Sequence, residues 1–329
     1  MTDNYKYMVR VSCMTYNHAP YIKDAMDGFC MQETKFPFVC TIMDDASTDG
    51  EPEVIKNYLQ THFDLDDKSV ARNEETEDSH LYFARHKTNK NCYFAVVLLK
   101  YNHYSIKMTK NPYISEWVDS VKYVAICEGD DYWIAADKLQ RQVEFLENHP
   151  DYGMCYCNFQ VYDVAKDLYI QNPNAKYEGI NDLILKNYIA TLTTMFRRDL
   201  SRKYINEINP KSKNWGMGDY PRWLWMELES KIYYIDEVVA TYHKLPESLS
   251  HSTNHQKRMA FLESSRDIRL FFANKYAMGK DIVNDINDVY YRGIAMVVKG
   301  KDKTTYRLAL GNIHKKSFKE KLKFVLSCC

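Results

Sequence analysis

The sequence carries no surplus of charge of either sign. Its 329 residues include 44 Lys plus Arg and 44 Asp plus Glu, so the formal net charge is zero. A protein that attracts nucleic acid through its overall field needs a basic surplus, and none is present here. We therefore expect no nucleic-acid partner, and we expect any anionic ligand to be held by a local site.

Long hydrophobic runs are also missing. The longest candidate, residues 93–99, is far shorter than the roughly 18 consecutive apolar residues that a membrane span requires. The first residues, MTDNYKYM, are polar and lead straight into a strand-like segment, so they show no signal peptide. From these two observations we expect neither a membrane span nor a secretory leader.

No CxxC pair occurs among the nine cysteines, and their number is odd. Cys155 and Cys157 have no second pair at a spacing that would complete a zinc site. Free thiols in a reducing compartment are the simplest interpretation. We therefore expect a cytoplasmic protein.

Glycine-rich phosphate loops are absent as well. Only Gly28 and Gly50 precede Gly129, so the chain has neither a GxGxxG nor a Walker A motif. This absence excludes a dinucleotide-binding dehydrogenase and a P-loop enzyme. It also argues against a nucleotidyltransferase, which would favour such a loop near its N-terminus.

The composition is that of a folded globular protein, with 45% hydrophobic and 27% charged residues. The N-terminal part of the chain alternates between strand and helix patterns. In order, these are a strand at 7–14, a helix at 21–32, a strand at 38–43 and a helix at 53–61. This order predicts a mostly parallel sheet, whose ligand sites lie beyond the carboxyl ends of the strands.

The remaining segments extend this α/β pattern. The polar segment 64–90 predicts a loop, and residues 92–107 are interpreted as a helix. Further strands are predicted at 122–127, 152–162, 192–196 and 232–242, and further helices at 138–148, 181–188 and 219–230. Helical periodicity continues from residue 254. We therefore expect a catalytic-type α/β domain over residues 1–253 and a helical extension over 254–329.

Three acidic clusters lie at the ends of predicted strands. They are Asp44-Asp45, Glu128-Gly129-Asp130-Asp131 and Gly218-Asp219. Carboxylates at such density bind a hard cation through their oxygens or supply a general base. Their positions predict one shared site.

Several short motifs follow one another along the chain in a recognisable order. Residues 11–17 read VSCMTYN, residues 44–50 read DDASTDG, and residues 127–133 read CEGDDYW, followed by KLQRQ at 138–142. Together they resemble family 2 glycosyltransferases of the GT-A fold. GDYP at residues 218–221 and SLSHS at 248–252 resemble a bacterial branch of that family. The resemblance covers roughly residues 8–255 and rests on the order and spacing of the motifs.

The resemblance implies a GT-A fold, a Rossmann-like and mostly parallel central sheet flanked by helices. It also implies a nucleotide-sugar site built from the ends of the first strands. The residues that match this site are Thr15, Tyr16, Asn17, Asp45, Glu128, Gly129, Asp130 and Asp131. Within it, Asp45 would hydrogen-bond the base. Asp130, at the last position of the DxD-like motif, would ligate Mn²⁺ or Mg²⁺.

The same resemblance assigns the remaining chemistry to the second half of the chain. Asp219 would be the general base that deprotonates an acceptor hydroxyl, in a single displacement that inverts the anomeric configuration. Two departures from the family pattern stand out. The first DxD position is Glu128, and Leu245 occupies the position of a metal-binding His in many relatives, so that His243 or His251 is the candidate replacement.

The implied function is therefore hexosyl transfer. The donor would be a nucleotide-sugar, with UDP as the first candidate. The acceptor would be a glycan or lipid-linked hydroxyl in bacterial cell-surface polysaccharide or lipopolysaccharide biosynthesis. The alternative is a non-catalytic protein that binds a nucleotide or carbohydrate through a decayed GT-A site.

Each motif also has a plain structural alternative. Residues 44–50 suit a turn followed by a helix cap, and residues 128–131 suit a solvated acidic turn. Asp219 precedes Tyr220-Pro221 and a helix, so it also fits an N-cap. Capping and catalysis are compatible, and both interpretations stay open.

Four further groups of residues also have both a functional and a plain structural interpretation. Trp223 and Trp225 either stack on sugar rings or pack in the core. Residues 193–194 either contact an acceptor or end a strand, and residues 197–198 either bind phosphate or lie at the surface. His251 and His255, four residues apart, form either a metal pair or unrelated side chains.

A basic amphipathic pattern fills residues 313–326, IHKKSFKEKLKFVL. It combines five lysines with Phe318, Leu322 and Val325. Such a helix lies on an anionic membrane or forms a plain surface helix. We therefore keep peripheral contact with the inner face of the plasma membrane as an expectation beside the cytoplasmic location.

Overall fold

The computed structural model describes residues 5–172, 176–245 and 254–328. The chain divides into two compact units. The first contains residues 1–175, 189–203 and 230–243, and the second contains residues 176–188, 204–229 and 244–329. The second unit thus includes residues 176–188, residues 204–229 and the beginning of its last segment, all of which we expected in the α/β domain. A boundary between residues 253 and 254 stays a prediction.

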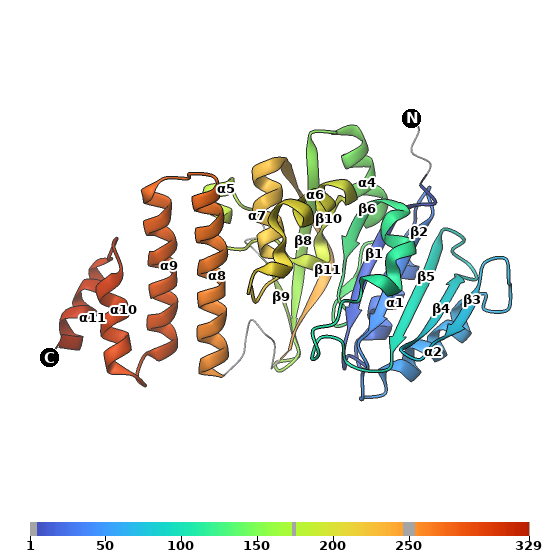
Figure 1. Cartoon of the computed structure of the whole chain (residues 1–329), viewed down its shortest axis with the longest axis horizontal. Coiled ribbons are helices and arrows are strands. Elements are labelled where there is room, and N and C mark those ends of the chain that lie inside the picture. The colour runs from blue at the N-terminus through green and yellow to red at the C-terminus, as the bar shows by residue number, and fades with distance from the viewer. Residues whose placement is uncertain (1–4, 173–175, 246–253, 329) are drawn as a thin grey trace. The chain divides into compact units, whose positions relative to one another are not determined.

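The first unit is built on a mixed sheet, which has 11 strands within the described residues, in the order β3-β4-β5-β2-β1-β6-β10-β8-β11-β7, with β9 paired to β8. The strands are β1 (Tyr7–Thr15), β2 (Phe38–Asp44), β3 (Arg72–Glu75), β4 (Ser79–Arg85), β5 (Cys92–Leu99), β6 (Val121–Ile126), β7 (Tyr132–Trp133), β8 (Tyr152–Asp163), β9 (Leu168–Gln171), β10 (Met195–Arg197) and β11 (Lys231–Lys244). Figure 1 shows β5, β2, β1 and β6 side by side; these four pair in parallel. The expected parallel core is confirmed.

Helices of the first unit flank this sheet. They are α1 (Ile22–Cys30), α2 (Glu51–His62), α3 (Ser115–Asp119), α4 (Lys138–Asn148) and the start of α6 (Arg198–Ile208). The apolar stripe of α1 is fully buried, as its periodicity predicted. A Cβ on Gly28 would stand 2.9 Å from the backbone N and O of Trp133, so glycine lets α1 approach β7 closely.

Two sequence expectations for residues 64–107 are wrong. Within the expected helix at 92–107, residues 92–99 form the strand β5, which lies between β2 and β4 and is almost entirely buried. A strand buried on both faces is a continuous apolar run, which periodicity alone does not separate from a buried helix. The expected loop at 64–90 contains β3 and β4. The outermost strand, β3, is polar because an edge strand faces water.

The second unit is helical, with no strand of its own among the residues described for it apart from the last residue of β11. In chain order it contains α5 (Ile180–Leu183), the end of α6, α7 (Tyr220–Glu229), α8 (His255–Lys275), α9 (Lys280–Val298), α10 (Lys303–Asn312) and α11 (Phe318–Cys328). The expected helical structure from residue 254 is confirmed. An apolar cluster that includes Ile294, Leu310 and Ile313 joins α9 and α10.

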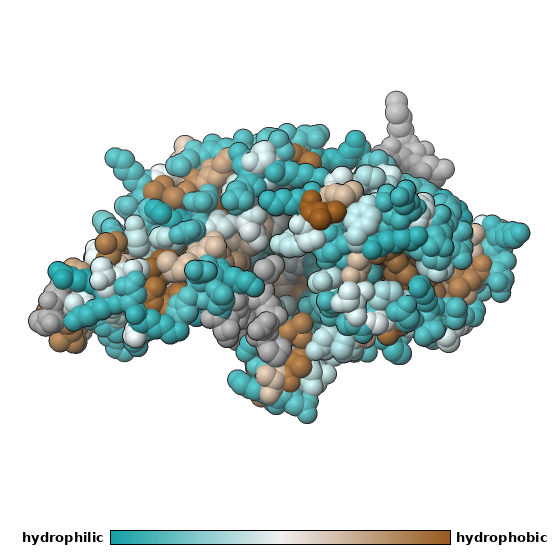
Figure 2. Space-filling view, turned by 60° about the horizontal axis from the view of Figure 1, so that its bottom comes forward, coloured by the Kyte–Doolittle hydropathy of each residue, from teal (hydrophilic) through white to brown (hydrophobic). Residues whose placement is uncertain are grey.

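On the face drawn in Figure 2, hydrophilic side chains predominate and hydrophobic ones form separate patches. Within the described part of the chain, none of the helices has the length and apolar character needed to cross a bilayer. The cysteines at positions 13, 30, 40, 92, 127, 155 and 157 are free thiols.

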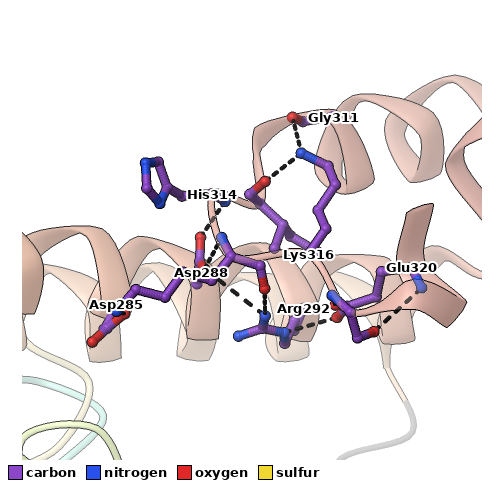
Figure 3. Close-up of polar contacts among 10 residues, drawn as sticks. Asp285, Asp288, Arg292, Gly311, His314, Lys316 and Glu320 are labelled. Atoms are coloured by element: carbon purple, nitrogen blue, oxygen red, sulfur yellow. Dashed lines mark hydrogen bonds and ion pairs between the residues drawn. The ribbon is translucent and has the colours of Figure 1, made fainter.

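The start of α11 is held by an ion pair whose strength depends on pH. Arg292 Nε donates to Glu320 Oε1 at 2.8 Å, and this bond, against a smaller effect of burial, lowers the pKa of Glu320 to about 2 (Figure 3). A depressed carboxyl pKa contributes stability above the ordinary pKa of Glu and loses it as pH falls toward the depressed value.

We therefore expect protection of the α11 amides against hydrogen exchange to be full above about pH 4.5 and to decline toward pH 2. The variant Glu320→Gln should show little of this decline, because its side chain does not titrate. Equal pH dependence in the two proteins would contradict the assignment.

Candidate functional site

The first two acidic segments meet at the carboxyl edge of the parallel strands. Thr15 ends β1 beside Asp44, which ends β2. The chain leaving β6 continues alongside β1, since Cys127 N donates to Ser12 O at 3.2 Å and Gly129 N donates to Met14 O at 3.0 Å. The acidic turn at residues 128–131 therefore lies directly against the end of β1. The sequence prediction that these two clusters gather at strand ends agrees with this geometry.

Gly129 is the point of closest approach. A Cβ on Gly129 would stand 2.2 Å from Thr15 Oγ1 and 2.6 Å from Thr15 Cβ. Both contacts are too short for any real side chain, and the neighbour on that side is the short, buried Thr15. The glycine of the DxD-like motif is therefore required by packing.

We expect Gly129→Ala to destabilise the protein by about 1–3 kcal/mol, the usual cost of forcing a methyl group into a packed site. Denaturant unfolding measures this loss. Gly218→Ala is the matched control, because a Cβ there meets nothing within 4 Å. Unfolding free energies that fall equally in the two variants would argue against the close approach.

The loops after β1 and β2 are joined by hydrogen bonds. Asn17 lies in the left-handed region at φ 57°. Its amide donates to Ser47 Oγ at 2.8 Å, and its Oδ1 accepts from Thr48 N at 2.8 Å. The Ala19 amide donates to Asp49 Oδ2 at 2.9 Å. The side chain of Asn17 thus positions the second loop, and its expected contact with a nucleotide stays a prediction.

Two residues that sequence reasoning missed complete this corner, Glu51 and His18. Glu51 is fully buried at the start of α2 and accepts from the Thr15 hydroxyl and, at 2.8 Å, from the His18 amide. The Thr15 Oγ1 also lies 3.2 Å from His18 Nδ1. A signal existed in the sequence, since an acid in the first turn after Gly50 suits a helix N-terminus.

These contacts fix the orientation of the His18 ring. The Thr15 hydroxyl has one proton, which it donates to the carboxylate of Glu51, so it accepts from His18 Nδ1. Nε2 of a neutral His18 then carries a lone pair, and it faces Asp130 Oδ2 at 3.8 Å. A His held in this way by its other nitrogen is a common arrangement in metal sites.

Asp130 is a partly exposed carboxylate of the acidic turn, as is Glu128. Its side chain is 23% exposed, whereas Asp131 is 4% exposed. Asp131 Oδ1 accepts from the His243 amide at 2.9 Å, and burial together with the charges of Asp130 and Glu128 raises the pKa of Asp131 well above its usual range. Asp131 therefore binds the turn to β11, while Asp130 faces any ligand.

His243 lies behind the acidic turn. Its Nδ1 donates to the carbonyl oxygen of Asp130, and its ring packs against Tyr21, Tyr132 and Tyr162 with centroids 4.9, 5.4 and 5.5 Å apart. The residue is 6% exposed. As the candidate replacement for a metal-binding His, His243 is thus already engaged through Nδ1. The other candidate, His251, lies outside the described residues.

Asp45 receives donors from a segment that sequence reasoning treated as an unrelated helix. Its carboxylate accepts from the amides of His103 at 2.8 Å and Tyr104 at 3.1 Å, and from Lys110 Nζ at 2.8 Å. Burial alone would raise the pKa of Asp45, but these three donors together hold it below its ordinary value. The side chain of Asp45 is 4% exposed, and its expected hydrogen bond to a nucleotide base stays a prediction.

Asp44 is different in character from Asp45. It is fully buried, and one oxygen accepts from Ser47 N at 3.2 Å. Its Oδ1 is buried and has no hydrogen-bond partner within the residues that the structure describes. Burial raises the pKa of Asp44 to about 6. The turn interpretation of residues 44–50 therefore holds for Asp44, whose side chain caps the turn.

The KLQRQ motif supports the site from behind. Lys138 is 1% exposed, and its Nζ lies 4.2 Å from the Trp133 ring and donates to Gln142 Oε1 at 2.7 Å. Burial lowers the pKa of Lys138 to about 8. Gln142 Nε2 donates in turn to the Thr193 carbonyl at 2.9 Å. This motif therefore holds β7 and the chain before β10 in place.

For residues 193–194 and for Arg197, the observed hydrogen bonds favour a structural role over ligand binding. The hydroxyls of Thr193 and Thr194 donate to the carbonyls of Ala190 and Thr191, each at 2.8 Å. Arg197 donates to carbonyl oxygens, among them Tyr152 O at 2.9 Å. These side chains are thus engaged by the backbone of the first unit.

Asp219 belongs to the second unit, at the start of α7. Its carbonyl accepts from the amides of Arg222 at 2.9 Å and Trp223 at 3.1 Å, which makes it the residue that begins the helix. Trp223 and Trp225 are fully buried, so the core interpretation is right for both. The capping position of Asp219 is thus observed, and its catalytic role stays a prediction.

Metal ligands are few in this structure. Among residues 5–172, 176–245 and 254–328, no group of three or more His, Cys, Asp or Glu side chains is arranged to hold an ion. The pair of Asp130 and His18 offers two donors. Such a pair fits Mg²⁺ or Mn²⁺ only when the ligand supplies further oxygens, which is how these ions are held in phosphate-binding sites. The Nε2 of His255 contacts Lys301 Nζ. Its predicted partner in a metal pair, His251, lies outside the described residues.

No protein-family model matches the sequence. Three curated mycobacterial proteins, one from Mycobacterium bovis and two from strains of Mycobacterium tuberculosis, are each 30% identical over 194 residues. All three are described as uncharacterized. The match takes in 57% of this chain and 46% of each relative, so the chain spans about half the length of the relatives it matches.

Solved structures resemble the fold over nearly the whole chain. Residues 1–349 of S. aureus TarS match with a TM-score of 0.58 at 15% identity, over 93% of this chain and 80% of that one. The mannosyltransferase PcManGT from Pyrobaculum calidifontis, in complex with GDP-Man and Mn²⁺, matches with a TM-score of 0.51 at 15% identity, over 99% and 85%. TarS in complex with UDP-GlcNAc also reaches 0.51, at 13% identity, over 97% and 89%. The chain therefore has the fold of GT-A glycosyltransferases, a mixed sheet flanked by helices and followed by C-terminal helices.

Proposed function

We propose that the protein transfers a hexose from a nucleotide-sugar to a hydroxyl group of a glycan or lipid-linked acceptor. The observation that carries this proposal is the group of side chains at the carboxyl edge of β2, β1 and β6. There, Thr15, Asp45 and Asp130 lie on adjacent parallel strands or directly after them. This edge is where open α/β sheets bind their ligands.

The nucleotide would lie across the ends of β1 and β2. Asp45 would accept from an N–H of the base, beside the donors from Lys110 and from the amides of residues 103 and 104. Tyr16 is 45% exposed next to it, so its ring is accessible for stacking. UDP is the first candidate. GDP is the second, because proteins of this fold are known with either nucleotide-sugar.

Asp130 and His18 would hold Mn²⁺ or Mg²⁺ together with the diphosphate of the donor. When bound, such a cation offsets the charge that develops on a departing diphosphate. Glu128, two positions earlier in the turn, and Gly129 between them would line the same edge. Thr15 and Glu51 keep the His18 ring oriented by the hydrogen bonds described above.

Asp219 would act as the general base. Its carboxylate would take the proton of the acceptor hydroxyl while that oxygen forms a bond to the anomeric carbon. The bond from the anomeric carbon to the diphosphate oxygen would break, and the nucleoside diphosphate would leave with the electron pair. One such displacement inverts the anomeric configuration. A general base must be a carboxylate near the acceptor hydroxyl, and Asp219 is the residue that the family resemblance assigns to this role.

The biological setting is proposed from the family resemblance alone. We propose a bacterial cell-surface polysaccharide or lipopolysaccharide glycan, elongated in the cytoplasm. The free thiols of the described cysteines support a reducing compartment.

Thermal unfolding with a panel of UDP-, GDP-, CMP- and dTDP-sugars, each with and without Mn²⁺, tests donor binding. A ligand at one hundred times its dissociation constant stabilises the native state by about 2.7 kcal/mol, which gives a measurable shift. We expect a metal-dependent rise with one nucleotide class. A folded protein that responds to none of them would overturn the proposal, and a response that does not depend on metal would favour the non-catalytic alternative.

A further inference from the structure

Helix α11 turns an apolar side to solvent. Phe318, Leu322, Val325 and Leu326 are 82%, 51%, 59% and 64% exposed. In a helix of about 3.6 residues per turn these four positions share one stripe, because Leu322 is three or four positions away from each of the others. We call them the outward stripe. In the region of α10 and α11, hydrophobic and hydrophilic atoms lie side by side (Figures 1 and 2).

The opposite side of α11 is bound to the rest of the second unit. Glu320 accepts from Arg292 Nε of α9 at 2.8 Å and from the Ser317 amide at 2.7 Å. Phe324 packs against the apolar cluster of α9 and α10. Both residues lie on the side of the helix away from the outward stripe. The helix therefore has a defined inner side, and its apolar stripe is not part of it.

The turn before α11 is also fixed in place. Asp288 of α9 is 1% exposed and accepts from the amides of His314 at 2.5 Å and Lys315 at 2.8 Å (Figure 3). Arg292 donates to the Lys315 carbonyl at 2.7 Å, and Lys316 Nζ donates to the Gly311 carbonyl at 2.9 Å. With the helix held at its start and along its inner side, the outward stripe has one orientation.

Lysines border the outward stripe on both sides. Lys319, Lys321 and Lys323 are all exposed. In the helical projection Lys319 and Lys323 follow one edge of the stripe, and Lys321 follows the other. Glu320, the acid of this helix, is paired with Arg292 and lies on the inner side. The exposed surface of α11 is therefore apolar in the centre and cationic at the edges.

This pattern selects one kind of partner. An interfacial helix buries its apolar side among acyl chains while lysines at its borders contact anionic headgroups. A second copy of the chain would instead bring three more lysines against these three, and like charges placed together oppose association. The charge arrangement thus complements an anionic lipid surface.

We propose that α11 is a docking surface for a membrane that contains anionic lipids, with the outward stripe inserted into the interface and the three lysines at the headgroups. The proposal does not depend on glycosyl transfer. It gives the orientation of the helix, which the sequence pattern alone left open between membrane contact and a plain surface helix.

Cosedimentation of the full chain with vesicles tests it. We expect binding to vesicles of phosphatidylcholine mixed with a minor share of phosphatidylglycerol, and much weaker binding to pure phosphatidylcholine. Leu322→Glu with Val325→Glu should lower the partition coefficient by roughly a hundredfold or more, because each change removes an apolar side chain that the bound helix would bury in the membrane. The triple change of Lys319, Lys321 and Lys323 to Gln should lower it by about a hundredfold on anionic vesicles, at about fivefold per lysine, and hardly at all on neutral ones.

Val238→Glu is the matched control, since Val238 is a 40% exposed apolar residue of the first unit and is expected to leave binding unchanged. All of the substituted positions are exposed, and circular dichroism checks that each variant is folded. Wild-type protein that ignores anionic vesicles would overturn the proposal. So would a lysine triple variant that binds them as well as wild type, or a dimer that Leu322→Glu with Val325→Glu dissociates while vesicle binding is absent.

Discussion

Replacing Asp219 by Asn is expected to reduce sugar transfer by about 10²–10⁴-fold, the usual contribution of a general base, while donor binding stays unchanged. Asn is as good an N-cap as Asp, so the start of α7 is preserved in this variant. Asp219 directly precedes α7, so it could serve in catalysis, in capping or in both. The substitution separates these two roles. Transfer is measured with radiolabelled donor and an envelope glycan and lipid fraction, and donor affinity by calorimetry.

A second capping aspartate of the same unit provides the control. Asp302 begins α10, and its side chain accepts from the Thr305 amide at 2.9 Å. Asp302→Asn should leave both transfer and donor affinity as in the wild type. If Asp219→Asn transfers at the wild-type rate, Asp219 is a structural cap and the base must be sought elsewhere.

Replacing Asp130 by Asn is expected to weaken the metal-dependent part of donor binding by roughly a hundredfold or more, because metal sites lose at least that much when a ligating carboxylate is removed. His18→Gln should have a similar direction of effect, since Gln cannot present the Nε2 lone pair of the ring. Titration of the donor at increasing Mn²⁺ concentration measures both. Asp66→Asn, at an exposed position of the first unit, is the control.

The neighbouring Asp131 sharpens this test. It is buried and accepts from the His243 amide, a bond that the amide oxygen of Asn also accepts, so Asp131→Asn should keep the metal dependence of donor binding that Asp130→Asn loses. A metal response that survives in Asp130→Asn and disappears in Asp131→Asn would reverse the roles assigned to the two carboxylates.

The parallel centre of the fold was predictable from sequence because its signals are local. Strand, turn and helix signals alternate from the N-terminus to residue 61, and the structure has β1, α1, β2 and α2 in that order. The gathering of the first two acidic segments was predictable because the carboxyl ends of parallel strands share one edge of a sheet. That Gly218-Asp219 shares their site stays a prediction. Strand β5 was not, since a strand buried on both faces has no alternation to detect.

The partners of the acidic residues were harder to foresee, because they come from distant parts of the chain. Asp45 takes its donors from residues 103, 104 and 110, and Asp131 takes one from residue 243. Such pairs depend on how loops fold back over the sheet, which no local pattern encodes. Likewise, the amphipathic pattern of α11 was visible in sequence, but which side faces inward depends on the contacts of Glu320 and Asp288.

The most direct test of the central claim is product analysis by proton NMR with the donor identified in the thermal panel. The account predicts that nucleoside diphosphate is released in step with a new glycoside whose anomeric configuration is opposite to that of the donor. Release with retained configuration would contradict the single displacement with Asp219 as base. Tight, metal-dependent donor binding with no release in the presence of any envelope fraction would contradict glycosyl transfer and leave the non-catalytic alternative.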